Sequence, residues 1–120
     1  MKKFLAIILL AGILLVAIFL FARSQYVPAE GATEIVIYTT EWCPYCKALR
    51  NILEKYQIPY TEHDTEKSLH GMLGFLVLGG RGVPLVVIGE NIIYGYDGME
   101  ITDALSDAGY ELPLDWETQD

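Results

Sequence analysis

A long run of apolar positions occupies the beginning of the chain. Residues 4–22 are nineteen uncharged residues, and only Gly12 among them lies outside the apolar set. As a helix, such a run spans about 28 Å, close to the ~30 Å hydrocarbon core of a bilayer. It is longer than the apolar segment of most secretory signals, and no clear small-residue cleavage site follows it. We therefore predict a transmembrane anchor or a signal segment over residues 1–23, with membrane contact through residues 4–22.

After a predicted linker at residues 24–33, the apolar positions take strand-like and helix-like spacings in turn. Short apolar runs bounded by turn residues predict strands at residues 35–38, 59–63, 83–88 and 92–94. Apolar positions at i, i+3, i+4 and i+7 predict helices at residues 47–56, 66–78 and 97–108. The predicted order is β-α-β-α-β-β-α in one α/β domain, residues 34–109. An acidic tail, residues 110–120, is expected to be ordered in part at most.

The helix predicted at residues 66–78 is more apolar than one buried face requires. Four positions at helical spacing form the face that we expect to meet the core: Leu69, Met72, Leu73 and Leu76. Phe75 and Leu78 are then surplus. They either add to the core or form an exposed docking surface.

Both cysteines lie in one motif, Trp42-Cys43-Pro44-Tyr45-Cys46, between the first strand and the next helix. The first N–H groups of a helix lack intrahelical partners and carry positive potential, so a thiolate placed there is stabilised. Such a thiolate is nucleophilic. Cys46 lies about one turn later, where it could attack a mixed disulfide formed on Cys43. We therefore predict redox chemistry, with Cys43 as the nucleophile and Cys46 as the resolving cysteine.

Two other uses of the cysteine pair compete with redox chemistry. A structural zinc site takes four ligands, and neither His63 nor His70 has suitable spacing to the pair. A purely structural disulfide would be unusual for so short a loop at the start of a helix. We expect no metal site of this kind.

Three segments resemble those of one known family. Cys43-Pro44-Tyr45-Cys46 resembles the active site of dithiol glutaredoxins, and Arg81-Gly82-Val83-Pro84 resembles the family's Arg-Thr-Val-Pro segment. Gly95-Tyr96-Asp97 is similar to the glycine-and-acid segment that opens the family's last helix. The resemblance implies a thioredoxin fold: a four-stranded mixed sheet with helices on both faces, here preceded by one transmembrane helix.

The resemblance also implies roles for individual residues. It implies six substrate-binding residues: Trp42, Tyr45, Arg81, Val83, Pro84 and Asp97. Pro84 would follow a cis peptide bond and face Cys43, and the Val83 backbone would pair with glutathione or a substrate peptide. Arg81 would lie near a glutathione carboxylate, or it is a solvated loop charge. Asp97 would contact the glutathione amine, or it is only a helix N-cap.

The charge of the domain bears on its partners. From residue 24 onward there are sixteen acidic residues and five basic ones, a net charge of −11. This excludes nucleic acid as a partner, since phosphate binding needs a basic surface. Many glutaredoxins have a lysine three residues before the first cysteine, whereas this chain has Thr40 there, followed by Glu41. Both features should weaken the attraction for anionic glutathione.

Basic residues near the apolar run indicate its orientation. Lys2 and Lys3 flank one end and only Arg23 flanks the other, which places the N-terminus in the cytoplasm and the domain in the periplasm or on the extracytoplasmic face.

The predicted function is an extracytoplasmic, membrane-anchored thiol–disulfide oxidoreductase that acts on protein or glutathione disulfides through Cys43 and Cys46. It would bind no cofactor, and glutathione is a candidate co-substrate. Its redox partner is not identified by the sequence. The alternative is a carrier whose two thiolates bind Cu(I) or bridge an iron–sulfur cluster.

Overall fold

The computed structural model describes residues 1–27, 31–113 and 115–116. In these ranges the order of elements is α1 (Lys2–Tyr26), β1 (Ile35–Thr39), α2 (Pro44–Lys55), β2 (Thr61–Asp64), α3 (Leu69–Val77), β3 (Leu85–Ile88), β4 (Asn91–Tyr94) and α4 (Gly98–Asp107). The predicted β-α-β-α-β-β-α order is confirmed, with boundaries that differ by a few residues. The largest shifts are at two helix starts, since α2 begins at Pro44, earlier than predicted, and α3 begins at Leu69, later than predicted. α3 starts there because Ser68 caps it by accepting a hydrogen bond from the Gly71 amide.

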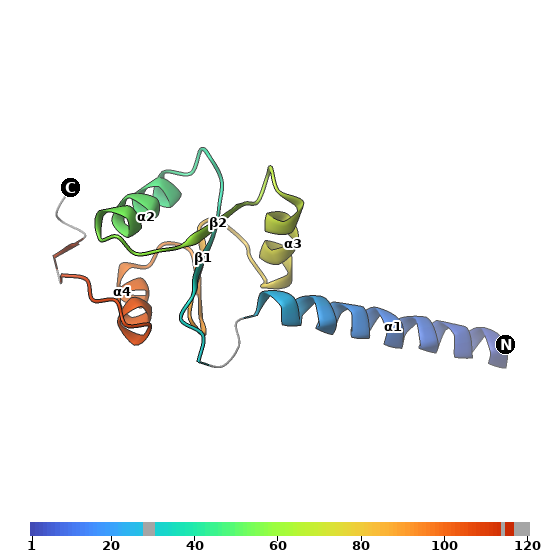
Figure 1. Ribbon diagram of the computed structural model, residues 1–120. Coiled ribbons are helices and arrows are strands. Elements are labelled where there is room, and N and C mark those ends of the chain that lie inside the picture. The colour runs from blue at the N-terminus through green and yellow to red at the C-terminus, as the bar shows by residue number, and fades with distance from the viewer. Residues whose placement is uncertain (28–30, 114, 117–120) are drawn as a thin grey trace.

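The four strands form one mixed sheet in the order β2-β1-β3-β4. β1 runs parallel to β2 and antiparallel to β3, and β3 runs antiparallel to β4. α2 and α4 cover one face of the sheet, while α3 and the end of α1 lie on the other face (Figure 1). This is the four-stranded arrangement of the thioredoxin fold, with helices on both faces.

Each face of the sheet has its own apolar core. On the α2–α4 side, Leu49 and Leu53 of α2 are buried against Ile37 and Val86 of the sheet, as the helical spacing predicts. On the α3 side, a smaller core consists of Tyr38, Leu78, Leu85 and Val87, with Phe75 and Tyr26 packed against it. The sheet is therefore packed between two helical layers, and the β1–α2 junction lies at the end of the central strand β1.

The prediction of which face of α3 meets the core is wrong. Leu69 and Leu76 are 69% and 60% exposed, and Met72 and Leu73 are also exposed. Phe75, which was expected to be surplus, packs against the smaller core, and Leu78, which caps the C-terminus of α3, is buried in it. The docking surface proposed for these two residues is therefore excluded.

Two glycines explain this rotation of α3. Gly71 and Gly74 are its buried positions. A Cβ at Gly71 would lie 2.4 Å from the backbone oxygen of Asp64, and one at Gly74 would lie 2.7 Å from the Tyr38 hydroxyl. The helix thus approaches the sheet through its backbone, and this close approach directs the large leucines away from the sheet.

The chain beside the domain is more ordered than expected. α1 continues through Tyr26, so residues 24–26 of the predicted linker are helical and Tyr26 packs against the domain. Residues 28–30 lie outside the described part of the chain. In the predicted tail, Leu112 and Trp116 are buried in the larger core, and the Trp116 indole donates a hydrogen bond to the Thr102 hydroxyl at 2.8 Å. The prediction of a tail that is ordered in part at most allows these two buried residues.

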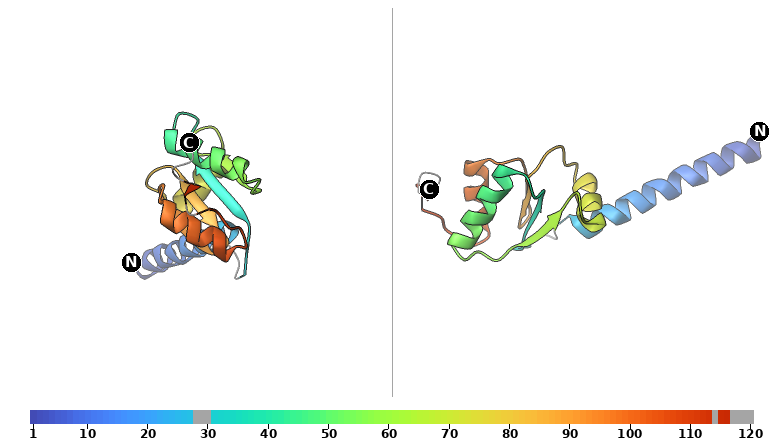
Figure 2. Two further views of the ribbon diagram at one scale, coloured as in Figure 1. Left: turned by 90° about the vertical axis from the view of Figure 1, so that its left-hand side faces the viewer. Right: turned by 90° about the horizontal axis from the view of Figure 1, so that it is seen from above.

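Within the described ranges, α1 is the one helix that is long and apolar enough to cross a membrane, and none of its residues is buried. In Figures 1 and 2 the helix projects well beyond the domain.

Candidate active site

The end of β1 and the start of α2 place Cys43 at a helix N-terminus. Cys43 is the N-cap of α2, and Pro44 occupies the first helical position, where a missing N–H costs nothing. The amide of Cys46 donates a hydrogen bond to the Cys43 sulfur at 3.2 Å. This bond and the helix dipole both favour negative charge on that sulfur.

Cys46 has a different environment, one turn into the helix. Its side chain is fully buried, whereas Cys43 remains 4% exposed. Burial, together with the hydrogen bond to the Cys43 side chain, raises the pKa of the Cys46 thiol to about 12. Cys46 is therefore protonated and shielded at neutral pH, as a resolving cysteine should be before the first exchange has occurred.

The loop before β3 lies against the Cys43 sulfur. The Val83–Pro84 peptide bond is cis, as the resemblance implied, and Pro84 is buried. The thiol of Cys43 lies 3.8 Å from the Val83 carbonyl oxygen. The structure thus brings together Cys43, Cys46 and the Val83–Pro84 segment.

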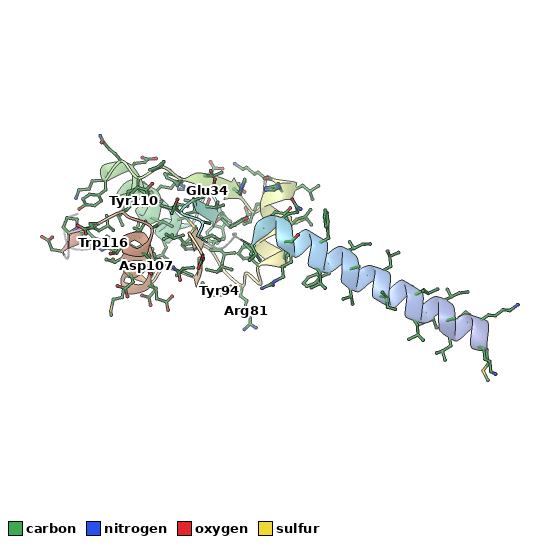
Figure 3. All side chains as sticks on the ribbon, turned by 60° about the horizontal axis from the view of Figure 1, so that its bottom comes forward. Glu34, Arg81, Tyr94, Asp107, Tyr110 and Trp116 are labelled. Carbon is green, nitrogen blue, oxygen red and sulfur yellow. The ribbon has the colours of Figure 1, made fainter. Side chains whose placement is uncertain are left out.

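Arg81 lies beside this group, next to a hollow on the surface. The hollow has a volume of about 610 Å³, and it is lined by Gly79, Arg81, Gly82, Val83, Tyr94 and Gly95. Arg81 is exposed and projects outward from the domain on the side where Tyr94 lies (Figure 3). Because Arg81 faces solvent beside this hollow, its guanidinium can form an ion pair with a carboxylate of a peptide bound at Val83.

Asp97 is the N-cap of α4. Its carboxylate accepts a hydrogen bond from the Glu100 amide at 3.0 Å, so capping explains its presence. Its predicted contact with a glutathione amine is not tested by this geometry.

Trp42 and Tyr45 surround the cysteines with exposed aromatic surface. They are 69% and 62% exposed. The Trp42 indole donates a hydrogen bond to Glu66 at 2.9 Å, and the Tyr45 ring stacks on Tyr96 with centroids 5.7 Å apart. Both rings are held in place and remain open to a substrate.

Arg50 was not among the site residues predicted from the sequence. The structure turns it toward the β1–α2 junction, where it donates to the Thr40 carbonyl at 3.1 Å and pairs with Glu62 at 2.6 Å. Its charge acts to lower the pKa of the Cys46 thiol, against the larger effect of burial. The four-residue spacing from Cys46 was the only sequence signal for this role.

Thr40 and Glu41 occupy the turn before the motif, where many glutaredoxins carry a lysine. The Thr40 hydroxyl is buried and has no hydrogen-bond partner among the described residues. Glu41 forms an exposed ion pair with Lys67. Lys67 thereby offsets part of the negative charge that the sequence places beside the cysteines.

The described residues contain no group of three or more histidine, cysteine, aspartate or glutamate side chains that could hold a metal ion. Within these ranges, binding of Cu(I) or of a cluster would rest on the two thiolates of one chain, joined by ligands from elsewhere.

Comparisons with known proteins agree with this geometry. The family described as glutaredoxin matches residues 35–93. A glutaredoxin of Pseudomonas aeruginosa is 35% identical over 77 residues, which cover 62% of this chain and 87% of that protein. The crystal structure of a thioredoxin-like protein is 25% identical, with a TM-score of 0.57 over 60% of this chain and all of the other. That of a buckwheat glutaredoxin–glutathione complex is 22% identical, with a TM-score of 0.57 over 78% of this chain and 96% of the other, and shows the shared fold. The chain therefore belongs to the glutaredoxin family, and it is a glutaredoxin-like thiol–disulfide oxidoreductase.

Proposed function

We propose that this protein is held in a membrane by α1 and exchanges protein or glutathione disulfides outside the cytoplasm. The observation that carries the exchange chemistry is the placement of the Cys43 sulfur between the Cys46 amide and the Val83 carbonyl. A substrate sulfur can therefore reach Cys43 while the substrate's extended chain binds to the backbone of Val83.

The proposed exchange begins with the Cys43 thiolate. It attacks one sulfur of a substrate disulfide, forms a mixed disulfide and releases the other substrate sulfur as a thiolate. Cys46 then loses its proton and attacks the Cys43 sulfur. The second substrate sulfur leaves and is protonated. The substrate has gained two electrons and the proton of Cys46, and its first thiolate takes a proton from solvent. The Cys43–Cys46 pair is now a disulfide, which a thiol donor must reduce before the next turnover.

The proposed location rests on α1 and on the basic residues at its ends. Lys2 and Lys3 precede the apolar run, and Arg23 alone follows it. Since basic residues favour the cytoplasmic side, the catalytic domain would lie outside. In such compartments disulfides are common substrates.

Glutathione as a substrate is supported by Arg81 beside its hollow and by the buckwheat glutaredoxin of similar fold, which was crystallised as a glutathione complex. The net charge of −11 on residues 24–120 opposes the binding of an anionic tripeptide. We therefore propose protein disulfides as the main substrates, with glutathione bound more weakly.

The chemistry is tested by trapping in membranes that contain the full chain. The Cys46→Ser variant should accumulate mixed disulfides with its substrates, which non-reducing electrophoresis and mass spectrometry would identify. The matched Cys43→Ser variant should accumulate none. Equal trapping by both variants, or trapping by Cys43→Ser alone, would overturn the assignment.

The location and the alternative function need separate readouts. A reporter that is active only outside the cytoplasm, fused after Asp120, should be active. Mass spectrometry showing a chain that begins near Arg23 would refute the anchor but not the location. A purified protein that carries stoichiometric copper, or the absorbance of an iron–sulfur cluster, and that exchanges no disulfides would favour the carrier function instead.

A further inference from the structure

Four apolar side chains on α3 face solvent. They form what we term the α3 stripe: Leu69, Met72, Leu73 and Leu76. Their spacing places them on one side of the helix, opposite the buried Gly71 and Gly74 that rest on the sheet. A contiguous exposed apolar surface of this kind usually marks a contact site.

The α3 stripe lies in a segment without charge. Between Leu69 and Val77 there is no Asp, Glu, Lys or Arg, and His70 is the one titratable residue, although residues 24–120 carry a net charge of −11. Whatever covers this surface is therefore recognised through apolar contact rather than through ion pairs.

The end of α1 packs along the flank of α3 and leaves the stripe uncovered. The Arg23 guanidinium donates to the carbonyl oxygen of Val77 at 3.2 Å. The Tyr26 hydroxyl lies 3.4 Å from Nδ1 of His70, and the same ring fills the space beside Gly74. α1 and α3 are thereby joined at both ends of α3.

The α3 stripe lies on the same side of the domain as the projecting apolar part of α1. α3 lies between the sheet and the projecting part of α1 in Figure 1 and in the right-hand view of Figure 2, and in Figure 1 its axis runs across that of α1. Since the stripe points away from the sheet, it points in the direction in which α1 extends. If α1 crosses a bilayer, α3 lies along the surface of that bilayer.

Arg23 sets the depth of α3. It is the first charged residue after the apolar run, so it marks the level at which α1 reaches the polar surface of a membrane. Because Arg23 bonds to Val77, the C-terminal end of α3 lies at this level. Tyr26, an aromatic residue with a polar tip, suits the same level.

We propose that the α3 stripe inserts into the interfacial region of the bilayer that α1 spans, so that α3 holds the catalytic domain flat on the membrane. This inference rests on the anchor in the proposed function. The occupant is phospholipid, because the stripe lacks acidic and basic side chains and faces the side of the domain from which the apolar part of α1 projects. A zwitterionic lipid should suffice.

The test uses the full chain in phosphatidylcholine nanodiscs that hold one chain each. Cys43→Ser and Cys46→Ser remove the native thiols, and a single nitroxide label is attached to Met72→Cys or Leu73→Cys. The matched control is Asn51→Cys, an exposed position of α2 on the opposite face of the sheet. Leu10→Cys reports on α1. Collisions of each label with oxygen, which enters lipid, and with a water-soluble nickel chelate are measured by electron paramagnetic resonance.

The labels at 72 and 73 should show an oxygen-to-nickel collision ratio severalfold higher than the label at 51, unchanged by salt. If they match the label at 51 while the label at 10 reports lipid, the inference is wrong and the anchor stands. If the label at 10 is also in water, the anchor fails and the inference falls with it. If protection appears only in nanodiscs holding two chains, with dipolar broadening between the labels, a second copy covers the stripe and the inference is overturned.

Discussion

The backbone amide of Cys46 donates a hydrogen bond to the sulfur of Cys43 at 3.2 Å, while the thiol of Cys46 itself is fully buried. The main chain of Cys46 thus hydrogen-bonds to the predicted nucleophile, Cys43, while the sulfur of Cys46 is shielded from solvent. The order of events in disulfide exchange follows from this asymmetry, because Cys46 can react only with a sulfur delivered to Cys43.

We predict that iodoacetamide at pH 7 alkylates Cys43 and leaves Cys46 unmodified. Because burial raises the pKa of the Cys46 thiol to about 12, this thiol stays protonated at pH 7, and burial also blocks the reagent. Peptide mass spectrometry after brief alkylation of the reduced protein measures the order. The Cys43→Ser variant should remain unlabelled under the same conditions. Faster labelling of Cys46 than of Cys43 would reverse the assigned roles.

Arg81, beside its surface hollow, is the residue that we propose to contact a glutathione carboxylate. We predict that Arg81→Gln raises KM for glutathione disulfide about two- to fivefold, the effect of losing an exposed ion pair worth up to ~1 kcal/mol. Turnover of an uncharged small disulfide should not change. Lys55→Gln, at the far end of α2 from Cys43, is the charge-matched control. Equal effects of the two variants on KM would show that Arg81 acts only through net charge.

The parts of the site that could be predicted from the sequence have short-range causes. A strand, a Cys-x-x-Cys motif and a helix start within a few residues of one another fix the place of Cys43. The cap of α4 at Asp97 is likewise encoded by neighbours, since its carboxylate needs only the amide three residues later.

The orientation of α3 could not be predicted from the sequence, because the apolar residues of this helix exceed one face. Helical spacing identified Leu69, Met72, Leu73 and Leu76 as one face but did not say which side meets the sheet. The decision came from Gly71 and Gly74, whose missing side chains allow backbone contact with Asp64 and Tyr38. The assumption that the largest apolar side chains are buried fails here, because α3 packs its backbone closely against the sheet at its glycines.

Two further residues depend on contacts distant in the sequence. Trp116 is buried because its indole reaches Thr102 and because the larger core leaves room for its ring. Arg50 turns inward because Glu62 on β2 and the Thr40 carbonyl converge on it. Neither partner is visible from local periodicity, which reports only neighbours along the same element.

Phe75 and Leu76 offer an adjacent pair with opposite environments. Phe75 packs against the smaller core, and Leu76 is 60% exposed. In detergent, Phe75→Ala should lower the free energy of unfolding by about 3 kcal/mol, the low end for a phenylalanine because its ring is only partly buried. Leu76→Ala should change it by about 0.5 kcal/mol or less. Chemical denaturation of both variants measures the difference. A larger loss for Leu76→Ala than for Phe75→Ala would show that α3 packs through the other face, and equal losses would contradict the difference in burial.

His63 should make the fold sensitive to mild acid. Burial, and then the neighbouring His70, lower the pKa of His63. Its ring lies 4.7 Å from the His70 ring and 5.5 Å from the Tyr38 ring, centroid to centroid. Because the unfolded chain binds the proton more tightly, stability is intact above the unfolded pKa of about 6.5 and declines as pH falls below that value.

We therefore predict that the melting temperature of the full chain in detergent falls between pH 7 and pH 5. His63→Asn should flatten this part of the profile, because no imidazole remains to be protonated beside the sheet. His70→Asn should flatten it less, since burial is the larger cause of the lowered pKa of His63. Carboxylates titrate mainly below this range, so they contribute little to the slope. A wild-type profile that is level from pH 7 to pH 5, or one that His63→Asn leaves unchanged, would contradict the prediction.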